Sequence, residues 1–501
     1  MGSPIPRPTA RRSLPYRSPH CTRNTAGRSA PGCFLLWASI DGRSVFTVES
    51  RLPRALTTGA ESSGMVRPLS GIRVIDFTEY IAGPYCTMML ADMGADVVKV
   101  ERPEGDAWRH TAPLAPYEGR GFLGVNRGKR SIAMDLERTQ AREAAQRLAA
   151  QADVLVTNYR PGVAARLGLD YQTLGAANPA LVYCENTAFG PAGPYRDRPG
   201  FDILSQAATG IILYENKVDR GVPTYIATMA VADLTTGMFM AFAIVNALFA
   251  RMSSGKGQHI ETSLFASGLA AQYRPLISVE EVDAPIREGF LRELDEARKQ
   301  GLTYEEAAKL RAQYIAGRGR NNYYRVYETR DGLIAVACLN NRQRRALRDA
   351  VAVSDPTVEG LTYDWFSEEV RRTHREVTGP MEDAFRSADT DQWLQRLDAA
   401  DVPCGVVNFP EEMFDNEHVR ANNLMLNIQH EVLGTLLMPA CPVRMSVSRP
   451  GTLAPPPALG AHGREILREF GFEEVVIKRL EEDGAVVTRA ELLARRPGQG
   501  D

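Results

Sequence analysis

The sequence predicts an α/β protein with a mainly parallel sheet and a second, smaller domain. Three observations support this fold class. Short apolar runs alternate with helical segments between about residues 72 and 265, a pattern typical of right-handed crossovers between parallel strands. Residues 286–316 are instead charged and amphipathic, and two strands joined by a turn follow them. A chain of 501 residues is long enough for two or three domains.

The first domain is predicted to begin with a strand, a helix and a strand. The run IRVIDF, residues 72–77, is apolar apart from one Arg and one Asp. A helix should follow, because Pro84 suits a first helical turn and Gly94 suits a helix end. No GxGxxG motif follows the first strand, so a standard dinucleotide site is not indicated. The further predicted strands are residues 95–101, 131–136, 153–159, 180–190 and 259–265.

Helices are predicted between these strands. Residues 139–152 are amphipathic, a short helix should follow Pro161, and another should begin near Phe201 after a loop rich in Pro, Gly and Arg. Residues 230–251 form a long, mostly apolar helix, which we expect to be buried. We expect no membrane-spanning helix.

The smaller domain and the C-terminal part have their own signals. A pair of surface helices is predicted in residues 286–316, broken at Gly301, and a hairpin in residues 321–339 that turns at 330–332. Short strands resume at about residue 402, residues 455–460 form a proline-rich connector, and residues 464–495 are helical.

The first 64 residues differ from the rest. Nine arginines and no lysine precede Thr57, and Ser and Pro are common. This composition is typical of an organelle transit peptide, a disordered tail or upstream sequence read from a wrong start codon. We favour disorder or a wrong start at Met1, since ordered patterning begins directly after Met65.

Composition narrows the function classes. The net charge of −2 argues against a general nucleic-acid or membrane-surface binder. The seven cysteines form no CxxC pair, and neither HExxH nor a Cys/His cluster indicates a metal. Scattered thiols are typical of a reducing, cytoplasm-like compartment.

Asp233 is the most informative single residue, because it is the only charge between Arg220 and Arg251. Its structural interpretation is a helix N-cap that accepts hydrogen bonds from the amides of Thr235 or Thr236. Its functional interpretation is a nucleophile. Apolar neighbours raise the cost of the ionised form and a helix start lowers it, so the carboxylate could attack an activated acyl group in a dry site.

Several ordered motifs resemble those of class III CoA-transferases, the family that includes formyl-CoA and carnitine CoA-transferases. The N-terminal motif is residues 69–106, LSGIRVIDFTEYIAGPYCTMMLADMGADVVKVERPEGD. It is followed in the family's order by NRGKRSIAMDL, DVLVTNYRPGVAARLGL, AFGPAGPYRDRPGFD, ADLTTGM and PPPALGAHGREIL. The resemblance covers about residues 69–480.

The resemblance implies a reaction and its residues. The family's catalytic aspartate lies in the motif ADLTTGM, so Asp233 is expected to form acyl anhydrides and an aspartyl-CoA thioester. Asp202, in PGFD, resembles an acidic position near the active site, although a helix cap is an equal alternative. Substrates would be an acyl-CoA and a small carboxylic acid, with no tightly bound cofactor.

CoA-contacting positions follow from the same motifs. Those expected here are Arg102, Met134, Asn158, Tyr159 and Arg166. Guanidinium groups suit the phosphates of CoA and an aromatic ring suits adenine, while the structural alternative for the arginines is solvated surface charge. A family lysine after IAMDL is Glu137 here, which argues against a phosphate contact at that position.

The smaller domain departs from the formyl-CoA transferases. Their tetraglycine loop is replaced by IAGRGRNNYY, which argues against formyl-CoA and oxalate as the substrate pair. Arg318 and Arg320 are candidates to bind a substrate carboxylate or, equally, belong to a surface turn.

Two rival functions remain. An α-methylacyl-CoA racemase-like isomerase would need the histidine of a GHD motif as a second acid/base group, but Phe201 stands there. A CoA-binding protein without chemistry is the rival from another class.

The resemblance also implies an architecture. A discontinuous Rossmann-like large domain (65–275 and 402–485) and a small domain (276–401) are expected to form a ring that interlocks with a second copy as a homodimer. Residues 486–501 are expected to be a tail. A cytoplasmic location is expected, or an organelle if residues 1–64 are a transit peptide.

Overall fold

The structure, a computed structural model, describes residues 39–40, 43–44, 67–214, 217–314, 321–359 and 367–494. The chain divides into two compact units, Met1–Ser62 and Ser63–Asp501. In the first unit the structure describes a two-stranded pair, β1 (Ser39–Ile40) and β2 (Arg43–Ser44). Most of residues 1–64, and with them the prediction of an extension outside the fold, lie outside the described residues.

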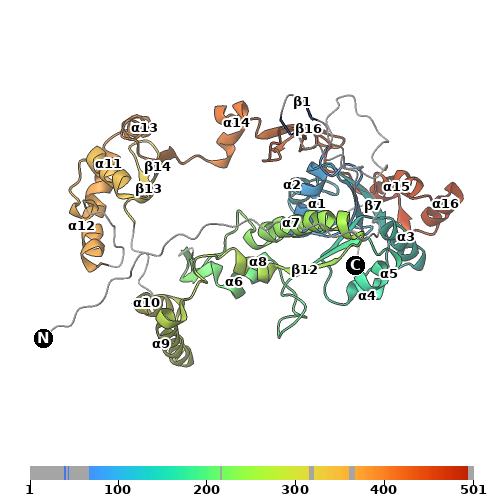
Figure 1. Cartoon of the computed structure of the whole chain (residues 1–501), viewed down its shortest axis with the longest axis horizontal. Helices are drawn as coiled ribbons and strands as arrows, with labels where there is room; N and C mark the ends of the chain where they lie inside the picture. The colour runs from blue at the N-terminus through green and yellow to red at the C-terminus, as the bar shows by residue number, and fades with distance from the viewer. Residues whose placement is uncertain are drawn as a thin grey trace. The chain divides into compact units, whose positions relative to one another are not determined.

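A seven-stranded sheet forms the centre of the large domain (Figure 1), with the order β12-β9-β8-β3-β4-β7-β18. Six strands are parallel to their neighbours, and β18 is antiparallel to β7. This confirms the predicted mainly parallel sheet. The strands are β3 (Arg73–Phe77), β4 (Asp96–Glu101), β7 (Lys129–Met134), β8 (Val154–Thr157), β9 (Val182–Thr187), β12 (His259–Ser263) and β18 (Val486–Val487).

Helices cover both faces of this sheet (Figure 1). On one face α1 (Ala82–Asp92) and α7 (Val231–Ser254) bury a core of aliphatic side chains against β3, β4, β8 and β9. The second core lies on the other face and includes residues from the C-terminal part of the chain. Its helices are α3 (Thr139–Ala150), α5 (Tyr171–Ala177), α15 (Gly463–Glu469) and α16 (Glu474–Glu482).

The strand order places a topological switch point between β3 and β8. From β3 the chain adds β4 and β7 on one side, then returns to add β8, β9 and β12 on the other. The connections after β3 and β8 therefore diverge at the carboxyl ends of the strands, which is where open parallel sheets bind ligands. The residues that directly follow β3, β4 and β8 consequently lie at the edge where a ligand is expected.

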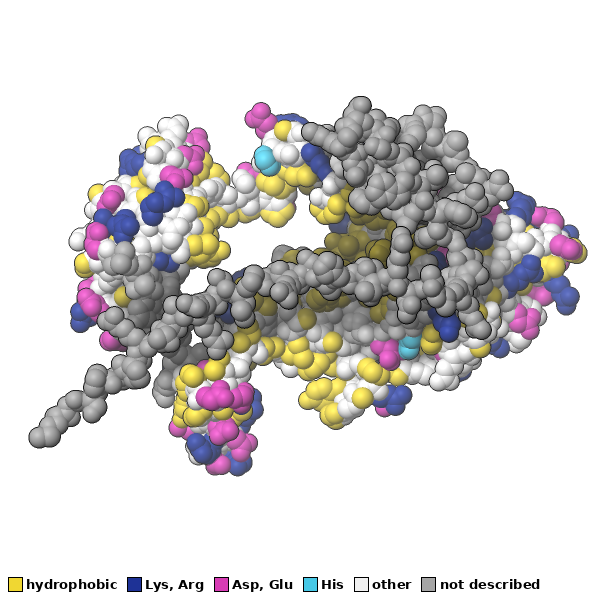
Figure 2. Space-filling view, viewed as in Figure 1, with side chains coloured by type: hydrophobic (Ala, Val, Ile, Leu, Met, Phe, Trp, Pro, Cys, Tyr) yellow, Lys and Arg dark blue, Asp and Glu magenta, His cyan; other side chains and the backbone are white. Residues whose placement is uncertain are grey.

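α7 is buried on one face only, which corrects the expectation of a wholly buried helix. Met240 and Ile244 are fully buried, whereas Phe242, Phe249 and Met252 are 69%, 74% and 73% exposed. The reason is that α1 and the sheet cover one side of the helix, and no described element covers the other. Figure 2 shows hydrophobic side chains exposed at several places on this face of the protein.

The expectation that no helix could span a membrane is also corrected. By length and composition alone α7 is long and apolar enough. However, 44% of its most apolar window is buried inside the protein, and a core helix passes the same test. Its contacts with α1 and the sheet account for the apolar composition on the buried side.

Two shorter helices, α6 (Asp202–Thr209) and α8 (Leu264–Ala270), pack against α7 and each other. The strand predicted for residues 259–265 ends at Ser263, because the Ser263 hydroxyl accepts a hydrogen bond from the amide of Ala266 and starts α8. Other short elements are β5 (Pro113–Ala115), β6 (Glu118–Gly119), α2 (Arg120–Gly124), α4 (Val163–Leu167), β10 (Val218–Asp219) and β11 (Val222–Pro223).

The small domain contains a three-stranded antiparallel sheet, β13 (Tyr324–Glu328), β14 (Leu333–Ala337) and β15 (Cys404–Val406). Three helices pack on it around Trp393 and Phe385: α11 (Asn341–Val351), α12 (Glu368–Arg386) and α13 (Thr390–Ala399). Because β15 pairs with β14, the chain leaves this domain after residue 406, later than the expected boundary at 402.

The predicted helix pair is present as α9 (Glu280–Lys299) and α10 (Tyr304–Tyr314). It is interrupted at Gly301, whose φ of 81° suits glycine. After the small domain come α14 (Glu417–Ala421), the hairpin β16 (Met425–His430) and β17 (Gly434–Pro439), and then the helices that complete the second core of the large domain. The chain ends, within the described residues, with α17 (Arg489–Ala494).

Candidate active site

Asp233 lies in the first turn of α7 and does not cap it. The residue at the N-cap position is Ala230, which has no side-chain acceptor. Asp202 performs this function from the neighbouring helix α6, since its Oδ1 accepts hydrogen bonds from the amides of Ala232 at 2.8 Å and Asp233 at 3.2 Å. Asp202 therefore has the capping role that was the structural interpretation of Asp233. The Asp233 carboxylate is left available for other contacts.

Asp202 is itself held in place. Its side chain is 9% exposed, and its other oxygen accepts a hydrogen bond from Nε2 of Gln206, one turn further along α6. The Gln206 amide also bonds the backbone N–H and C=O of Ile226, at 2.9 and 3.2 Å. A single side chain thus connects the cap of α7 to the segment that precedes this helix.

The Asp233 carboxyl group lies against the start of a second helix. The backbone N–H of Ala82, the first residue of α1, favours its ionised form. Burial is the main reason why the pKa of Asp233 is raised, with the Asp202 carboxylate adding to it, and the Ala82 amide partly opposes the rise. The resulting pKa is about 7, so the group exchanges its proton in the physiological range.

Gly237 allows the two helices to approach. It is one turn after Asp233, and a Cβ at this position would lie 2.7 Å from the carbonyl oxygen of Ala82 and 3.0 Å from the ring of Tyr85. Any larger residue would push α7 away from α1. The glycine of ADLTTGM is therefore required for the contact between the Asp233 carboxyl and the Ala82 amide.

Aromatic rings border the site. Phe201 precedes Asp202 and is 50% exposed, and its ring meets Tyr80 edge-on with 5.2 Å between centroids. Tyr80 has a φ of 68°, an uncommon backbone conformation for a non-glycine residue, and its amide is held by Asp106 at 3.1 Å. Position 201, where the racemase motif has histidine, thus contributes an apolar ring without an exchangeable proton.

Three of the predicted CoA contacts meet at the switch point of the sheet. Asn158 directly follows β8, and its side-chain amide bonds both the N–H and the C=O of Glu79, at 3.0 and 2.7 Å. Arg102 directly follows β4 and forms an ion pair of 2.9 Å with the Glu79 carboxylate. Tyr159 packs against Phe77 at the end of β3, with 6.3 Å between ring centroids. These residues line the carboxyl edge of neighbouring strands.

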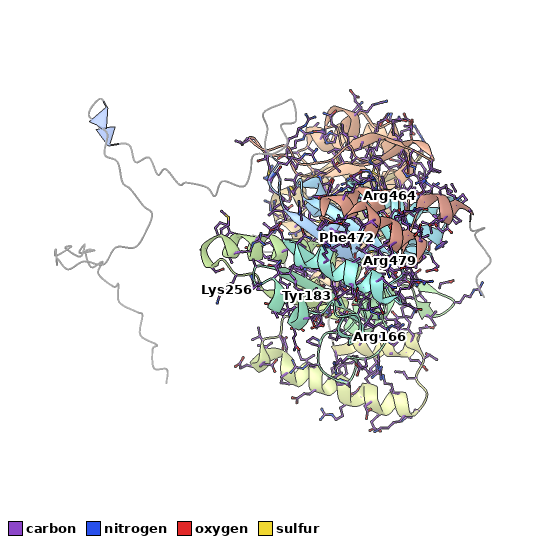
Figure 3. All side chains as sticks on the ribbon, turned by 90° about the vertical axis from the view of Figure 1, so that its right-hand side faces the viewer. Arg166, Tyr183, Lys256, Arg464, Phe472 and Arg479 are labelled. Carbon is purple, nitrogen blue, oxygen red and sulfur yellow. The ribbon has the colours of Figure 1, made fainter. Side chains whose placement is uncertain are left out.

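The other two predicted contacts are placed differently. Met134 is fully buried in the core beneath the C-terminal helices and pairs in register with Val486 of β18. Its side chain therefore has no surface on which adenine could lie, and the buried contacts identify it as a core residue. Arg166 is exposed on α4 (Figure 3). Arg318 and Arg320 lie outside the described residues.

A buried ionic network beneath the site was not predicted. Lys99 forms an ion pair with Asp106 at 3.0 Å, and Lys129 with Asp76 at 3.0 Å, and all four side chains are inaccessible to solvent. Lys99 also donates to the carbonyl of Thr78 at 2.6 Å. The sequence did contain a signal for this network, namely single charged residues within the predicted strands. A lysine in a buried strand needs an acidic partner. The network fixes the loop between β3 and α1.

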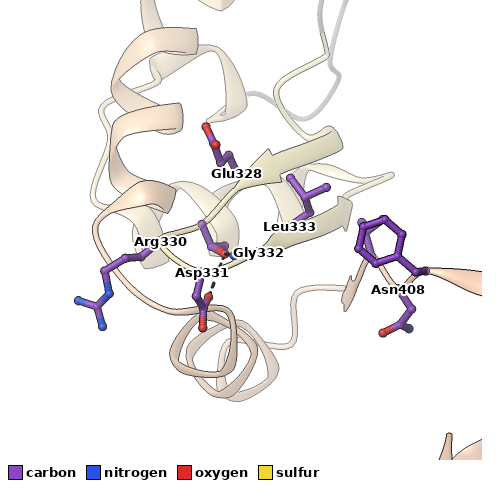
Figure 4. A pocket seen from close by; sticks show the side chains of 9 residues that line it. Glu328, Arg330, Asp331, Gly332, Leu333 and Asn408 are labelled. Carbon is purple, nitrogen blue, oxygen red and sulfur yellow. Dashed lines mark hydrogen bonds between the residues drawn. The ribbon is translucent and has the colours of Figure 1, made fainter. Parts of the chain in front are cut away.

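An open pocket of about 470 Å³ lies in the small domain, away from these residues in the sequence (Figure 4). Residues 328–333 at the β13–β14 turn and residues 407–409 line it. None of the predicted catalytic or CoA-binding residues is among them. The cluster around Asp233 and the neighbouring edge of the sheet is therefore the candidate active site.

This geometry defines a class of protein: a doubly wound α/β protein that presents an aspartate of raised pKa between two helix starts. The chain belongs to CoA-transferase family III, whose profile matches residues 69–463. It is therefore an enzyme that transfers CoA between an acyl-CoA and a carboxylic acid.

Relatives of known name agree with this assignment. The mouse succinyl-CoA:glutarate CoA-transferase is 30% identical over 85% of this chain and 92% of its own length. The succinate–glutarate CoA-transferase of Agrobacterium fabrum is 33% identical over 80% of this chain and 96% of its own. Among solved structures, a CaiB/BaiF family protein from Brucella suis has a TM-score of 0.61 at 29% identity, over 80% of this chain and 99% of that one.

Proposed function

We propose that Asp233 carries CoA from donor to acceptor through covalent intermediates. An Asp233 oxygen attacks the thioester carbonyl of the donor, the C–S bond breaks, and CoA thiolate leaves an acyl-aspartyl anhydride. The thiolate then attacks the aspartyl carbonyl, releasing the donor acid and forming an aspartyl-CoA thioester. The acceptor carboxylate attacks that thioester, and the returning thiolate attacks the acceptor's acyl carbon, which restores Asp233 and yields the new acyl-CoA.

The position of Asp233 is the observation that carries this mechanism. The group is partly buried, lies near the backbone amide of Ala82 at the start of α1, and is free of the capping role. With a pKa of about 7, roughly half of it is the nucleophilic carboxylate at neutral pH. Partial burial also limits the access of water, which would hydrolyse the anhydride. The scheme consumes no water and needs no resident cofactor.

CoA is proposed to bind along the carboxyl edge of β3, β4 and β8. Arg102 offers a half-exposed guanidinium to a phosphate, and Tyr159 offers an aromatic side chain beside it. Asn158 holds the backbone of Glu79 and so shapes the loop that leads to α1. Arg166 on α4 is a further phosphate candidate, and Glu137 is exposed where a family lysine is absent.

The acceptor is proposed to be a small dicarboxylic acid, with succinyl-CoA as donor. Support comes from the names of relatives, which include CoA-transferases for glutarate and malate with succinyl-CoA. The replacement of the tetraglycine loop argues against formyl-CoA and oxalate, although one relative is an acetyl-CoA:oxalate CoA-transferase. A screen of dicarboxylates against succinyl-CoA, read by mass spectrometry, identifies the pair.

A trapping experiment tests the mechanism. The enzyme is mixed with succinyl-CoA without acceptor, quenched with hydroxylamine or borohydride, digested and analysed by mass spectrometry. Modification is expected at Asp233 and absent in Asp233→Ala, which should retain CoA binding but lose turnover. Asp219→Ala, which changes an exposed carboxylate on β10, is the matched control. Full turnover by Asp233→Ala, or a label on another acid, would contradict the proposal.

The same assays separate the rival functions. A CoA-binding protein without chemistry would show no turnover in the wild type with any acid. A racemase would exchange the α-proton of a branched acyl-CoA in D2O without an acceptor. We expect no such exchange, because Phe201 replaces the second acid/base group.

The enzyme is further proposed to act as an interlocked homodimer. The support is the resemblance to the family together with the exposed apolar face of α7, which carries Phe242, Val245, Phe249 and Met252. Apolar patches of this kind mark interaction surfaces.

A further inference from the structure

A cluster of potential metal ligands lies on β9 and β12, outside the candidate active site. Glu185 is on β9, and His259 and Glu261 are on β12. One ligand atom from each of the three residues lies within 4.8 Å of the other two. Imidazole nitrogen and carboxylate oxygen are both ligands of Zn²⁺ and related divalent ions.

The pairing of the strands produces the cluster. β12 pairs with β9 in parallel, with Glu261 opposite Glu185 and His259 opposite Tyr183. Because side chains alternate along a strand, all four residues point to the same face of the sheet. The strand register therefore places the two glutamates side by side, and His259 is the next residue of β12 on the same face.

Two carboxylates side by side on neighbouring strands repel each other. In the described part of the chain, neither is paired with a lysine or arginine, and the nearest cationic candidate is His259, whose Nε2 lies 3.4 Å from Glu185 Oε1. That distance and the partial exposure of both side chains, 29% and 30%, leave room for an ion to approach. A divalent cation would neutralise the pair, as well as bridge the edge strand to β9.

The surroundings also contain polar atoms that lack partners. Tyr183 is fully buried, and its hydroxyl has no hydrogen-bond partner among the described residues. Nε2 of His259 is also buried, and its only partner among the described residues is Glu185 Oε1 at 3.4 Å. The imidazole is held in position by Tyr171 of α5, stacked at 4.9 Å between centroids, and by the edge of Tyr183 at 5.4 Å. Orienting the ring in this way reduces the entropy that ligation would cost.

We propose that Glu185, His259 and Glu261 form a divalent-cation site, with Zn²⁺ as the preferred ion, that ties the edge strand β12 to the central sheet. Water would complete the coordination on the exposed side. The site is separate in composition from the Asp233 cluster, so it would support the fold and take no part in CoA transfer.

Metal binding by the intact protein tests the proposal. Isothermal titration with Zn²⁺ should show one site per chain. Glu261→Gln and His259→Gln should each lower the Zn²⁺ affinity by more than the roughly 10–100-fold that is typical when an outer-shell partner is lost. Glu143→Gln on α3 and His418→Gln on α14, both exposed, are the matched controls and should bind like the wild type. Co²⁺ should give a spectrum without the thiolate charge-transfer band that binding by a cysteine would produce.

Thermal unfolding distinguishes two explanations for the paired glutamates, a bound cation and a shared proton. If a cation fills the site, Zn²⁺ should raise the melting temperature of the wild type and leave that of Glu261→Gln unchanged. If the two glutamates only share a proton, Glu261→Gln should be more stable than the wild type and Zn²⁺ should have no effect on either. The second result, or Zn²⁺ binding that both variants retain, would overturn the proposal.

Discussion

The backbone amide of Asp233 donates a hydrogen bond to the carboxylate of Asp202, with 3.2 Å between nitrogen and oxygen. The two acids therefore have different tasks. Asp202 stabilises the start of α7, and its negative charge contributes to the raised pKa of its neighbour. Asp233, relieved of capping, presents its own carboxyl to the Ala82 amide. Removing Asp202 would change both the position of Asp233, the proposed nucleophile, and its pKa.

The pH dependence of catalysis should report this coupling. Since the reactive form of Asp233 is the carboxylate and its pKa is about 7, kcat/KM should rise with pH below 7 and level off above it. Asp202→Asn keeps a side-chain oxygen for the two amides and removes the charge, so the rising limb should move to lower pH. Asp219→Asn is the control. If the pH profiles of kcat/KM for the wild type and Asp202→Asn rise over the same pH range, Asp202 has no electrostatic effect on Asp233.

Asp233→Asn should be more stable than the wild type at pH 8. The folded-state pKa is raised from 3.8 to about 7, so the folded protein keeps a proton that the unfolded chain loses at lower pH. Stability is therefore lost as pH rises through this window, by about 1.4 kcal/mol per pKa unit. Asparagine avoids this loss. Urea unfolding should show an advantage of a few kcal/mol at pH 8 and a smaller one at pH 5; an equal advantage at both would argue against the raised pKa.

Gly237→Ala should impair both folding and catalysis. The added methyl group would lie 2.7 Å from the carbonyl oxygen of Ala82, so α1 and α7 must separate, at a cost of about 1–3 kcal/mol. The contact between Asp233 and the Ala82 amide would lengthen, and kcat should fall. Gly124→Ala is the control, since no other atom lies within 4 Å of a Cβ there. Calorimetry measures the stability and steady-state kinetics the activity of both variants. If Gly237→Ala changes neither, α1 and α7 do not need a glycine where they cross.

Asn158→Ala should weaken acyl-CoA binding more than it slows the chemical steps. The substitution removes both hydrogen bonds to the Glu79 backbone, worth about 1–3 kcal/mol together, and frees the loop that supports Arg102. KM for acyl-CoA should increase roughly tenfold or more. Asn178→Ala removes a comparable amide that bonds the carbonyl of Ala152 elsewhere and should leave KM unchanged. A change confined to kcat would place CoA elsewhere.

Phe249→Glu should disturb assembly if the exposed face of α7 is covered by a second copy. The side chain is 74% exposed within one chain, so a monomer should tolerate the charge. A dimer that buries this face should dissociate, as seen by sedimentation velocity. Val475→Glu, at an exposed apolar position on α16, is the control. A wild type that sediments as a monomer would contradict the proposed homodimer.

Much of the sheet could be predicted because each strand is a short apolar run bounded by turn residues. The catalytic candidate could also be found, since a lone acid in an apolar helix is conspicuous. The roles of its neighbours could not. Asp202 caps a helix other than its own, Met134 is a core residue, and Gln206 connects segments 20 residues apart. None of these contacts joins residues that are close in the sequence, so no spacing of residue types could predict them.

The sequence by itself determined the alternation of strands and helices, the family motifs and the presence of an aspartate in an apolar helix. These are properties of neighbouring residues, which periodicity and residue type record directly. Tertiary structure decided which acid caps α7, which face of that helix is covered, and that Glu185 and Glu261 stand side by side. Such relationships depend on strand register and helix crossing, which arise only when segments distant along the chain pack together.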